Sequence, residues 1–302
     1  MNKRKRQIIQ AARELFIKQG FGNTSIMDII EAAKISKGTF YNHFSSKNEC
    51  LIAILEESRD ELTNARRELA LNQNPSDINV LIDQISLIFH LSRKENFTQM
   101  FSTTFDSNDQ EIKEVIEKHM IIEVDWLANR FIDIYGEKLR PISFECAIHS
   151  FAIMVFSLHL LNIATGSAPP PEKVVKVALN RIDTVIPILL ETKDILFHED
   201  IVQSLKSKIS TAAVSKESLI EQLQGFVDQL SDKDSDRCIE LANFLLVELK
   251  KNDEKLYVLE SLLTSFNHAF NQTPHEKEAK EIANSLWQYL YSKKEKFNIC
   301  TY

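Results

Sequence analysis

Residues 24–47 constrain the fold of this chain more than any other stretch, because two very short helical patterns follow each other there with only a tight break between them. Ser25 can cap the first helix and Ser36 the second, since a serine hydroxyl accepts an otherwise unpaired backbone N–H. The second helix is expected from Lys37 to about Phe44, and a helix of this length is not stable alone in water. Neighbouring helices must therefore hold it.

The second helix of this pair has two different faces. Phe40 and Phe44 lie four residues apart on one side and are predicted to be buried together. The other side is polar, basic and aromatic, and it consists of Lys37, Gly38, Thr39, Tyr41 and Asn42. A helix-turn-helix explains this combination, because its second helix lies in the DNA major groove while its first helix braces the second.

The motif Ser-Lys-Gly-Thr-Phe-Tyr-Asn-His-Phe at residues 36–44 resembles the helix-turn-helix of the TetR family of bacterial transcriptional regulators. Thr24-Ser25 before the motif and Ser46-Lys47 after it fit the same family. So do Ala-Ala-Arg-Glu-Leu-Phe at 11–16 and Gly20-Phe21, which match the first helix of the family and its end. The resemblance covers about residues 5–55, whereas the rest of the chain contains no motif that matches the family.

Two positions depart from the family pattern. Lys34 occupies a turn position that is often Gly in the family, and a positive φ there would cost about 1 kcal/mol. Ile30 stands where the family often has Ala, which indicates a slightly different packing of the two helices.

The expected DNA contacts lie in and around the motif. Asn42 can pair with adenine and Lys37 with guanine, whereas Tyr41 and Lys47 are better placed for phosphates. Gly38 would let the helix backbone approach DNA closely. The complete expected set is Thr24, Ser25, Ser36, Lys37, Gly38, Thr39, Tyr41, Asn42, His43 and Lys47.

The charge distribution supports a DNA-binding end. The whole chain carries a net charge of −7, but residues 1–50 hold nine Lys or Arg and four acidic residues, hence +5, which leaves −12 for the remainder. A basic end on an acidic body is typical of a DNA-binding head on a core that does not bind DNA. Lys3–Arg6 are expected either to contact phosphates or to be a solvated terminus.

Composition and periodicity predict an all-α fold. The 302 residues include only 6 Gly and 7 Pro, too few for a loop-rich β protein. We expect a helix-turn-helix domain at 1–46, a helical effector-binding and dimerisation domain at 47–197, and a helical C-terminal extension at 198–302. The expected helices are at about 2–19, 47–71, 76–91, 95–106, 108–135, 143–165, 172–190, 199–211, 216–230, 233–251, 253–270 and 275–294, with a kink or interruption at Pro187.

Residues 146–165 are the most apolar segment and approach the length of a membrane span. His149, His159 and Asn162 interrupt the segment, so a buried helix is the better interpretation and no membrane is expected. The helices at 143–165 and 172–190 are expected to form a dimer interface, because of their position in the family and because the first is apolar nearly all round.

Resemblance to the family implies a small effector molecule bound among the helices of the body. Its binding would shift the linking helix and change the spacing of two DNA-binding heads, which must lie about 34–36 Å apart. The candidate lining residues are Met100, Phe101, Phe105, Trp126 and Phe156. An apolar lining of this kind indicates a hydrophobic effector.

The sequence therefore predicts a dimeric, cytoplasmic transcriptional regulator, most simply a repressor released by a small ligand. Two alternatives stay open: a chromosome-organising protein with the same head, and a regulator whose signal is a partner protein. An enzyme is not expected, because the chain has no Gly-rich phosphate loop, nucleophile elbow or His-Glu-x-x-His motif. The four cysteines lack zinc-site spacing and suit a reducing cytoplasm, so neither a metal nor a cofactor is expected.

Overall fold

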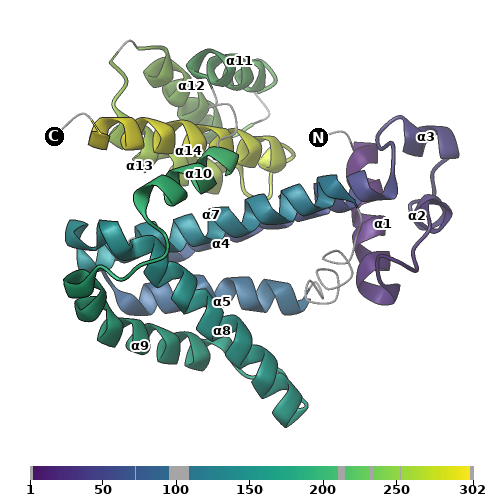
Figure 1. Cartoon of the computed structure of the whole chain (residues 1–302). Coiled ribbons are helices and arrows are strands. Elements are labelled where there is room, and N and C mark those ends of the chain that lie inside the picture. The colour runs from purple at the N-terminus through teal and green to yellow at the C-terminus, as the bar shows by residue number, and fades with distance from the viewer. Residues whose placement is uncertain are drawn as a thin grey trace. The chain divides into compact units, whose positions relative to one another are not determined.

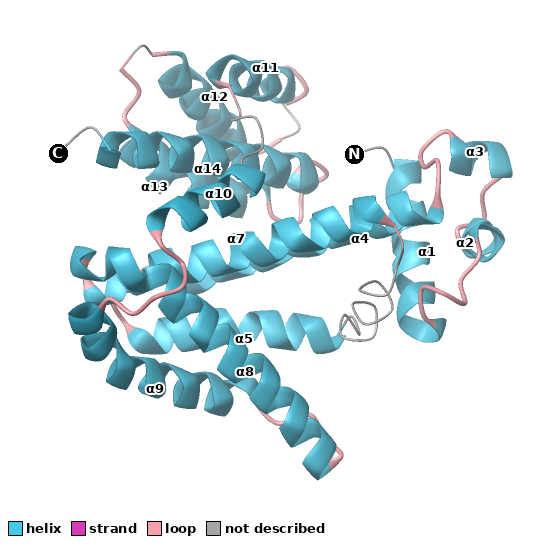
Figure 2. Cartoon of the chain, in the orientation of Figure 1, coloured by secondary structure: helices cyan, strands magenta, loops and turns pink. Residues whose placement is uncertain are grey.

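The structure is a computed structural model that describes residues 3–71, 73–94, 109–209, 215–231, 234–251 and 253–299. All regular secondary structure in these ranges is helical (Figure 1; Figure 2), which confirms the predicted all-α fold. The chain divides into two compact units, residues 2–209 and residues 210–302.

The first unit contains α1 (Lys3–Gln19), α2 (Ile26–Ala32), α3 (Lys37–Tyr41), α4 (Lys47–Ala70), α5 (Ile78–Lys94), α7 (Gln110–Tyr135), a 3-10 helix η1 (Glu137–Ile142), α8 (Ser143–Thr165), α9 (Pro171–Thr192) and α10 (Glu199–Ile209). The second unit contains α11 (Lys216–Val227), α12 (Asp236–Lys250), α13 (Leu256–Phe270) and α14 (Glu276–Ile299). Most observed bounds lie within a few residues of the predicted ones. The helix predicted at 95–106 lies outside the described residues.

Two helices differ from their predictions. α3 ends at Tyr41 instead of Phe44, although the Phe44 N–H still donates to the Phe40 carbonyl at 2.9 Å and keeps both rings on one side. Pro187 does not interrupt α9, which continues to Thr192 because buried Ile186 and Leu189 hold both sides of the proline against the body.

The helix-turn-helix domain closes around one apolar core. Ile112 and Ile116 of α7 belong to this core, so the first turns of α7 pack onto the domain. The other buried members are Ile8, Ile9, Ala12, Phe16, Ile29, Ile30, Phe40, Phe44, Cys50, Leu51, Ile54 and Leu55.

A second core lies among α5, α7, α8 and α9, and α4 runs from the helix-turn-helix domain along this body (Figure 1). Arg66 fixes the far end of α4 there. Its Nη2 lies 2.7 Å from Glu123 Oε2, and its guanidinium lies 3.6 Å from the centroid of the Trp126 ring. Separating buried Arg66 from its partner on α7 would leave an unpaired charge in the interior, so this contact holds α4 against the body.

The second half of α8 contradicts the prediction of a buried helix. Its first half is buried, but Val155, Phe156 and Ile163 are more than half exposed, and Figure 1 shows this end of α8 projecting from the body. The stretch Glu137–Thr165 is long and apolar enough to cross a membrane by length and composition, with 22% of its most apolar window buried. Such a single helix is weak evidence for a membrane span, because core helices pass the same test.

α10 packs on α7 within the first unit, with Val202 and Leu205 against the body core. The boundary expected at 197/198 therefore moves to 209/210. The second unit has a separate core, in which Phe226, Phe266 and Phe270 stack with centroids 4.9–5.9 Å apart.

Candidate nucleic-acid interface and effector cavity

Hydrogen bonds at both serine caps define the two short helices. Ser25 Oγ accepts the Asp28 N–H at 3.1 Å, and Asp28 Oδ2 accepts the Ser25 N–H at 2.8 Å, which completes a capping box on α2. The backbone hydrogen bond from Ser25 lowers the pKa of Asp28. Ser36 Oγ accepts the Thr39 N–H at 3.1 Å and so begins α3. Both predicted caps are present.

Lys34 makes the turn between α2 and α3 in the left-handed region, with φ of +50°. Its N–H donates to the Glu31 carbonyl at 3.1 Å, and the Ile35 N–H donates to the Ile30 carbonyl at 3.2 Å. These bonds fix the turn in spite of the strain that a side chain meets at positive φ.

The outer face of α3 is available to a ligand. Lys37, Gly38, Tyr41 and Asn42 are exposed, whereas Phe40 is fully buried beneath them. The Lys37 ammonium lies 6.0 Å from the centroid of the Tyr41 ring. Thr39 is half-buried, with its hydroxyl 2.8 Å from Ser36 Oγ, and His43 is also half-buried. The chain thus brings the groove-facing candidates together on one surface.

Two other predicted contacts have partners inside the domain. Thr24 is 1% exposed and its hydroxyl donates to the Gly20 carbonyl at 2.8 Å, so the structure does not support a direct DNA contact by this side chain. Lys47 Nζ donates to the carbonyls of Phe21 and Thr24, each at 2.7 Å, and lies 4.3 Å from the Phe21 ring centroid.

Lys47 therefore holds the loop between α1 and α2 against the start of α4, a role that sequence reasoning missed. Burial lowers the pKa of its ammonium group. An ammonium has three donors and two are used here, so a phosphate contact by Lys47 stays a prediction.

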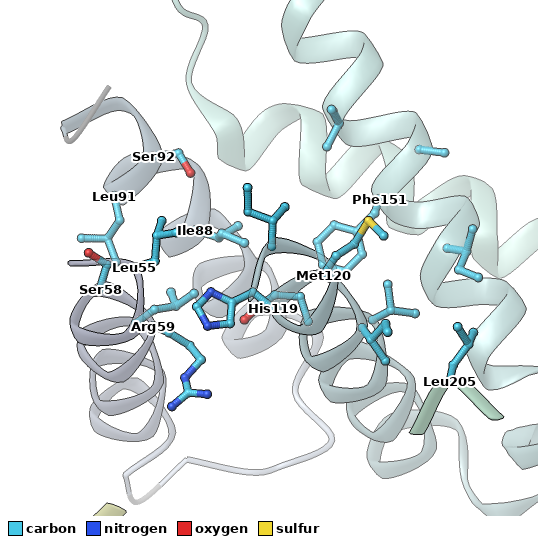
Figure 3. A pocket seen from close by; sticks show the side chains of 18 of the residues that line it. Leu55, Ser58, Arg59, Ile88, Leu91, Ser92, His119, Met120, Phe151 and Leu205 are labelled. Atoms are coloured by element: carbon cyan, nitrogen blue, oxygen red, sulfur yellow. The ribbon is translucent and has the colours of Figure 1, made fainter. Parts of the chain in front are cut away.

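A cavity of about 650 Å³ lies beside the middle of α4, and α5, α7, α8 and residues 197–205 supply the rest of its described wall (Figure 3). The lining is mostly aliphatic and aromatic. Its polar residues are Ser58, Arg59, Ser92, His119 and Glu123. A cavity of this size with few polar groups suits a small apolar molecule.

Arg59 and His119 give the cavity its polar end. The Arg59 guanidinium is already paired, at 3.0 Å from both Glu56 Oε2 and Asp60 Oδ1. His119 Nε2 lies 3.5 Å from Glu56 Oε1 but makes no hydrogen bond in the structure, although the atom is buried. A buried ring nitrogen in this position can bind one polar group of a ligand.

The two predicted lining residues that the structure describes, Trp126 and Phe156, are not part of this wall. Met100, Phe101 and Phe105 lie outside the described residues. Trp126 stacks on Arg66 instead, and Phe156 is 65% exposed on the projecting half of α8, five residues beyond Phe151, which does line the cavity. Ser58, Arg59 and His119 are polar residues on otherwise apolar helix faces, and this pattern is the feature of the sequence that could have indicated the cavity.

Comparison with known proteins agrees with this geometry. Residues 8–54 match the model of the bacterial regulatory proteins, tetR family. The uncharacterized HTH-type transcriptional regulator YuxN of Bacillus subtilis is 24% identical over 268 residues, which cover 87% of this chain and 91% of YuxN. That span exceeds the first unit, so the similarity includes part of residues 210–302.

Two further relatives match shorter stretches. The uncharacterized HTH-type transcriptional regulator YerO of Bacillus subtilis is 32% identical over 171 residues, or 52% of this chain and 58% of YerO. The HTH-type transcriptional regulator QacR of Staphylococcus aureus is 27% identical over 135 residues, or 43% of this chain and 66% of QacR. No solved structure matches the chain.

Proposed function

Because this chain is a DNA-binding transcriptional regulator of the TetR family, we propose that it is a cytoplasmic repressor that leaves its operator when a small apolar molecule enters the cavity. A homodimer presents two copies of α3 to successive major grooves. No catalytic step is part of this function.

Base reading falls to the exposed face of α3. Asn42 is the residue for a bidentate contact to adenine, and Lys37 the residue for guanine. Gly38 supports this placement, because the nearest atom that an added Cβ would meet is Ser36 Oγ at 3.8 Å. The protein itself therefore tolerates a side chain there, whereas a DNA backbone or base in close approach would not.

Phosphate contacts surround this reading face. Tyr41 is 48% exposed next to the Lys37 ammonium, and Lys3, Arg4 and Arg6 are exposed in the first turns of α1. Such contacts add affinity that falls with salt concentration but carry no sequence information. Ser25 and Ser36 cap the first turns of α2 and α3, and Thr39 lies in the first turn of α3, so their hydroxyls and nearby N–H groups can bind the same phosphates.

The dimer forms through the apolar surface that α8 and α9 expose. Val155, Phe156 and Ile163 on α8 and Val177 and Ile188 on α9 supply this surface. Several large apolar side chains exposed together are unusual on a monomer, and a second copy would cover them without requiring a membrane.

One observation carries the proposed release mechanism: Leu55 of α4 and Ile116 of α7 belong both to the core of the helix-turn-helix domain and to the cavity wall. A ligand that moves either side chain acts directly on the packing that orients the domain. A small tilt of α4 in each protomer changes the separation of the two α3 helices, so simultaneous binding to both half-sites is lost.

The first test measures DNA binding by fluorescence anisotropy, with DNA from upstream of the protein's own gene and a scrambled duplex at several salt concentrations. Asn42→Ala should lower discrimination between single-base operator variants by about 1–3 kcal/mol and leave the affinity for scrambled DNA nearly unchanged. Asn243→Ala makes the same substitution at an exposed position of α12 and serves as the control. Equal losses on every duplex would refute base reading by Asn42.

The second test titrates neutral apolar molecules into the operator complex. Release of the protein from DNA by one of them, with no effect on scrambled DNA binding, is expected. An operator complex that no such molecule releases would contradict the effector part of the proposal and favour a partner protein as the signal.

A further inference from the structure

α10 forms part of the cavity wall without being buried itself. Phe197 and Leu205 line the cavity, yet none of the residues of α10 is fully buried. A helix of 11 residues with so little buried surface is not stable alone. Its position on the body therefore depends on a small number of contacts.

The N-terminal end of this segment is held by one carboxylate. Glu145 of α8 is 3% exposed, and its Oε2 accepts the N–H groups of Leu196 and Phe197 at 3.0 and 3.1 Å. The Phe197 ring packs on Phe144 with centroids 6.0 Å apart. These contacts fix the point where the chain turns from α9 into α10.

The other end is held by an ion pair. Lys206 Nζ lies 2.7 Å from Oδ1 of Asp125 on α7, and the two side chains are 28% and 11% exposed. Asp125 is thus a nearly buried carboxylate whose charge partner comes from α10. Between the two attachments, Val202 and Leu205 pack on the body core, and Leu205 points to the cavity in Figure 3.

We propose that α10 is a strap that closes one side of the effector cavity, with the Lys206–Asp125 ion pair as its latch. The proposal rests on the proposed function insofar as the cavity receives an apolar effector. Release of the latch swings Leu205 out of the wall, with Phe197 held by Glu145 as the fixed end of the strap, and admits the ligand. A bound apolar ligand then adds contacts to both side chains, so occupancy of the cavity and docking of α10 stabilise each other.

Opening of the strap is tested without a ligand, in the full-length protein. Ser58 lines the cavity and is buried, so Ser58→Cys places a thiol inside it with a minimal change of shape. Alkylation of this thiol by N-ethylmaleimide is followed by tandem mass spectrometry, whose fragment ions distinguish it from Cys50 on the same tryptic peptide. Adding Lys206→Met should accelerate alkylation roughly fivefold, the factor that corresponds to about 1 kcal/mol of lost ion-pair stabilisation.

Two variants make the test specific. Lys208→Met removes an exposed charge from the same helix and should leave the rate unchanged. The reversed pair Asp125→Lys with Lys206→Glu should return the rate toward that of Ser58→Cys alone. Equal rates in the Lys206 and Lys208 variants would overturn the proposal, because the cavity would then open elsewhere.

Amide hydrogen exchange, measured with and without the neutral apolar dye Nile red, tests whether ligand binding and docking of α10 stabilise each other. Binding should slow the exchange of amides in 197–206 as well as those in α4 and α7 that flank the cavity. Slowing confined to α4 and α7 would overturn the strap and leave the effector cavity intact. If the dye slows none of these amides, the result counts against the proposed effector site. The alkylation rates would still show whether the strap opens.

Discussion

The helix-turn-helix domain and the unit of residues 215–299 are both closed around three phenylalanines, but they depend on them differently. In the first, Phe40 and Phe44 anchor a helix of five residues, and Phe16 packs beside them from α1. In the second, Phe226, Phe266 and Phe270 come from helices of 12 and 15 residues with further buried leucines along them. Caps and single side chains hold the short helices, whereas distributed burial holds the long ones.

This difference also decides what a motif can reveal. The outer face of α3 must be polar while its inner face is aromatic, so both demands fall within a few residues and leave a recognisable pattern. The second unit needs only apolar residues at helical spacing, which many sequences satisfy. Its fold could therefore be predicted, but its role could not.

The largest expected effect comes from Phe40→Ala. Phe40 is 0% exposed, and its truncation should cost about 3–5 kcal/mol, enough to unfold α3 and abolish operator binding. Phe266→Ala, at an equally buried ring, should destabilise α11–α14 while DNA binding persists. Hydrogen exchange by mass spectrometry locates each loss, and anisotropy reports DNA binding. Loss of operator binding in the Phe266 variant would show that the two units are not independent.

Most of the fold followed from the sequence because helix ends carry chemical signals. Ser25, Ser36 and Ser46 all cap helices in the structure as side chains that accept a backbone N–H. The exposed half of α8 was predicted as buried, because periodicity shows that a helix is apolar but not which molecule covers it. The same holds for the boundary of the second unit, since α10 is amphipathic whether it packs on α7 or elsewhere.

The sequence predicted one part of the candidate site better than the other. The groove-facing residues of α3 are local to one motif, whereas the cavity is assembled from helices far apart in sequence, and aromatic content alone misassigned Trp126 and Phe156. The inward direction of Lys47 was also hidden, because a lysine at the start of a helix fits a phosphate contact and a structural tie equally well.

The second prediction concerns pH and the second unit. Burial raises the pKa of Glu254, but hydrogen bonds from Lys216 and Tyr289 outweigh it and lower the value from 4.5 to about 2. Because the folded pKa lies below the unfolded one, this stabilisation is present above about pH 4.5 and is lost as the pH falls toward 2. Glu254→Gln should remove about 2–3 kcal/mol at pH 7 and flatten the acid dependence of the unit.

Global hydrogen exchange of peptides from 215–290 between pH 7 and 3 measures this effect. Glu240→Gln, an exposed position on α12, is the matched control and should retain the wild-type slope. Parallel slopes in the wild type and the Glu254 variant would contradict a depressed pKa. Operator binding at pH 7 should be unchanged in both variants, which separates this unit from the helix-turn-helix domain.

The third prediction asks whether Lys47 is a structural tie. Lys47→Met removes two charge-assisted hydrogen bonds from a half-buried ammonium and should destabilise the helix-turn-helix domain by about 1–2 kcal/mol. Lys18→Met removes one exposed positive charge from the same domain and serves as the control. Chemical denaturation measures stability, and the salt dependence of DNA binding measures phosphate contacts. A salt slope that falls by about one in the Lys47 variant without loss of stability would make Lys47 a phosphate contact alone.

The smallest expected effect is a gain of stability at the turn between α2 and α3. Lys34 has φ of +50°, a conformation that costs a residue with a Cβ about 1 kcal/mol and that glycine adopts freely. Lys34→Gly should raise the unfolding free energy of the helix-turn-helix domain by up to about 0.5 kcal/mol after the greater flexibility of glycine in the unfolded chain is included.

Lys34→Ala separates strain from charge in this experiment, because alanine also lacks the ammonium group but keeps the Cβ. The alanine variant should be as stable as the wild type or slightly less stable, so the gain belongs to glycine alone. If alanine stabilises the domain as much as glycine does, removal of the positive charge from a basic domain is the cause, and the turn is not strained. Because α3 is only five residues long and begins three residues after Lys34, a relaxed turn should also slow amide exchange in α3, whereas exchange in α11–α14 should not change.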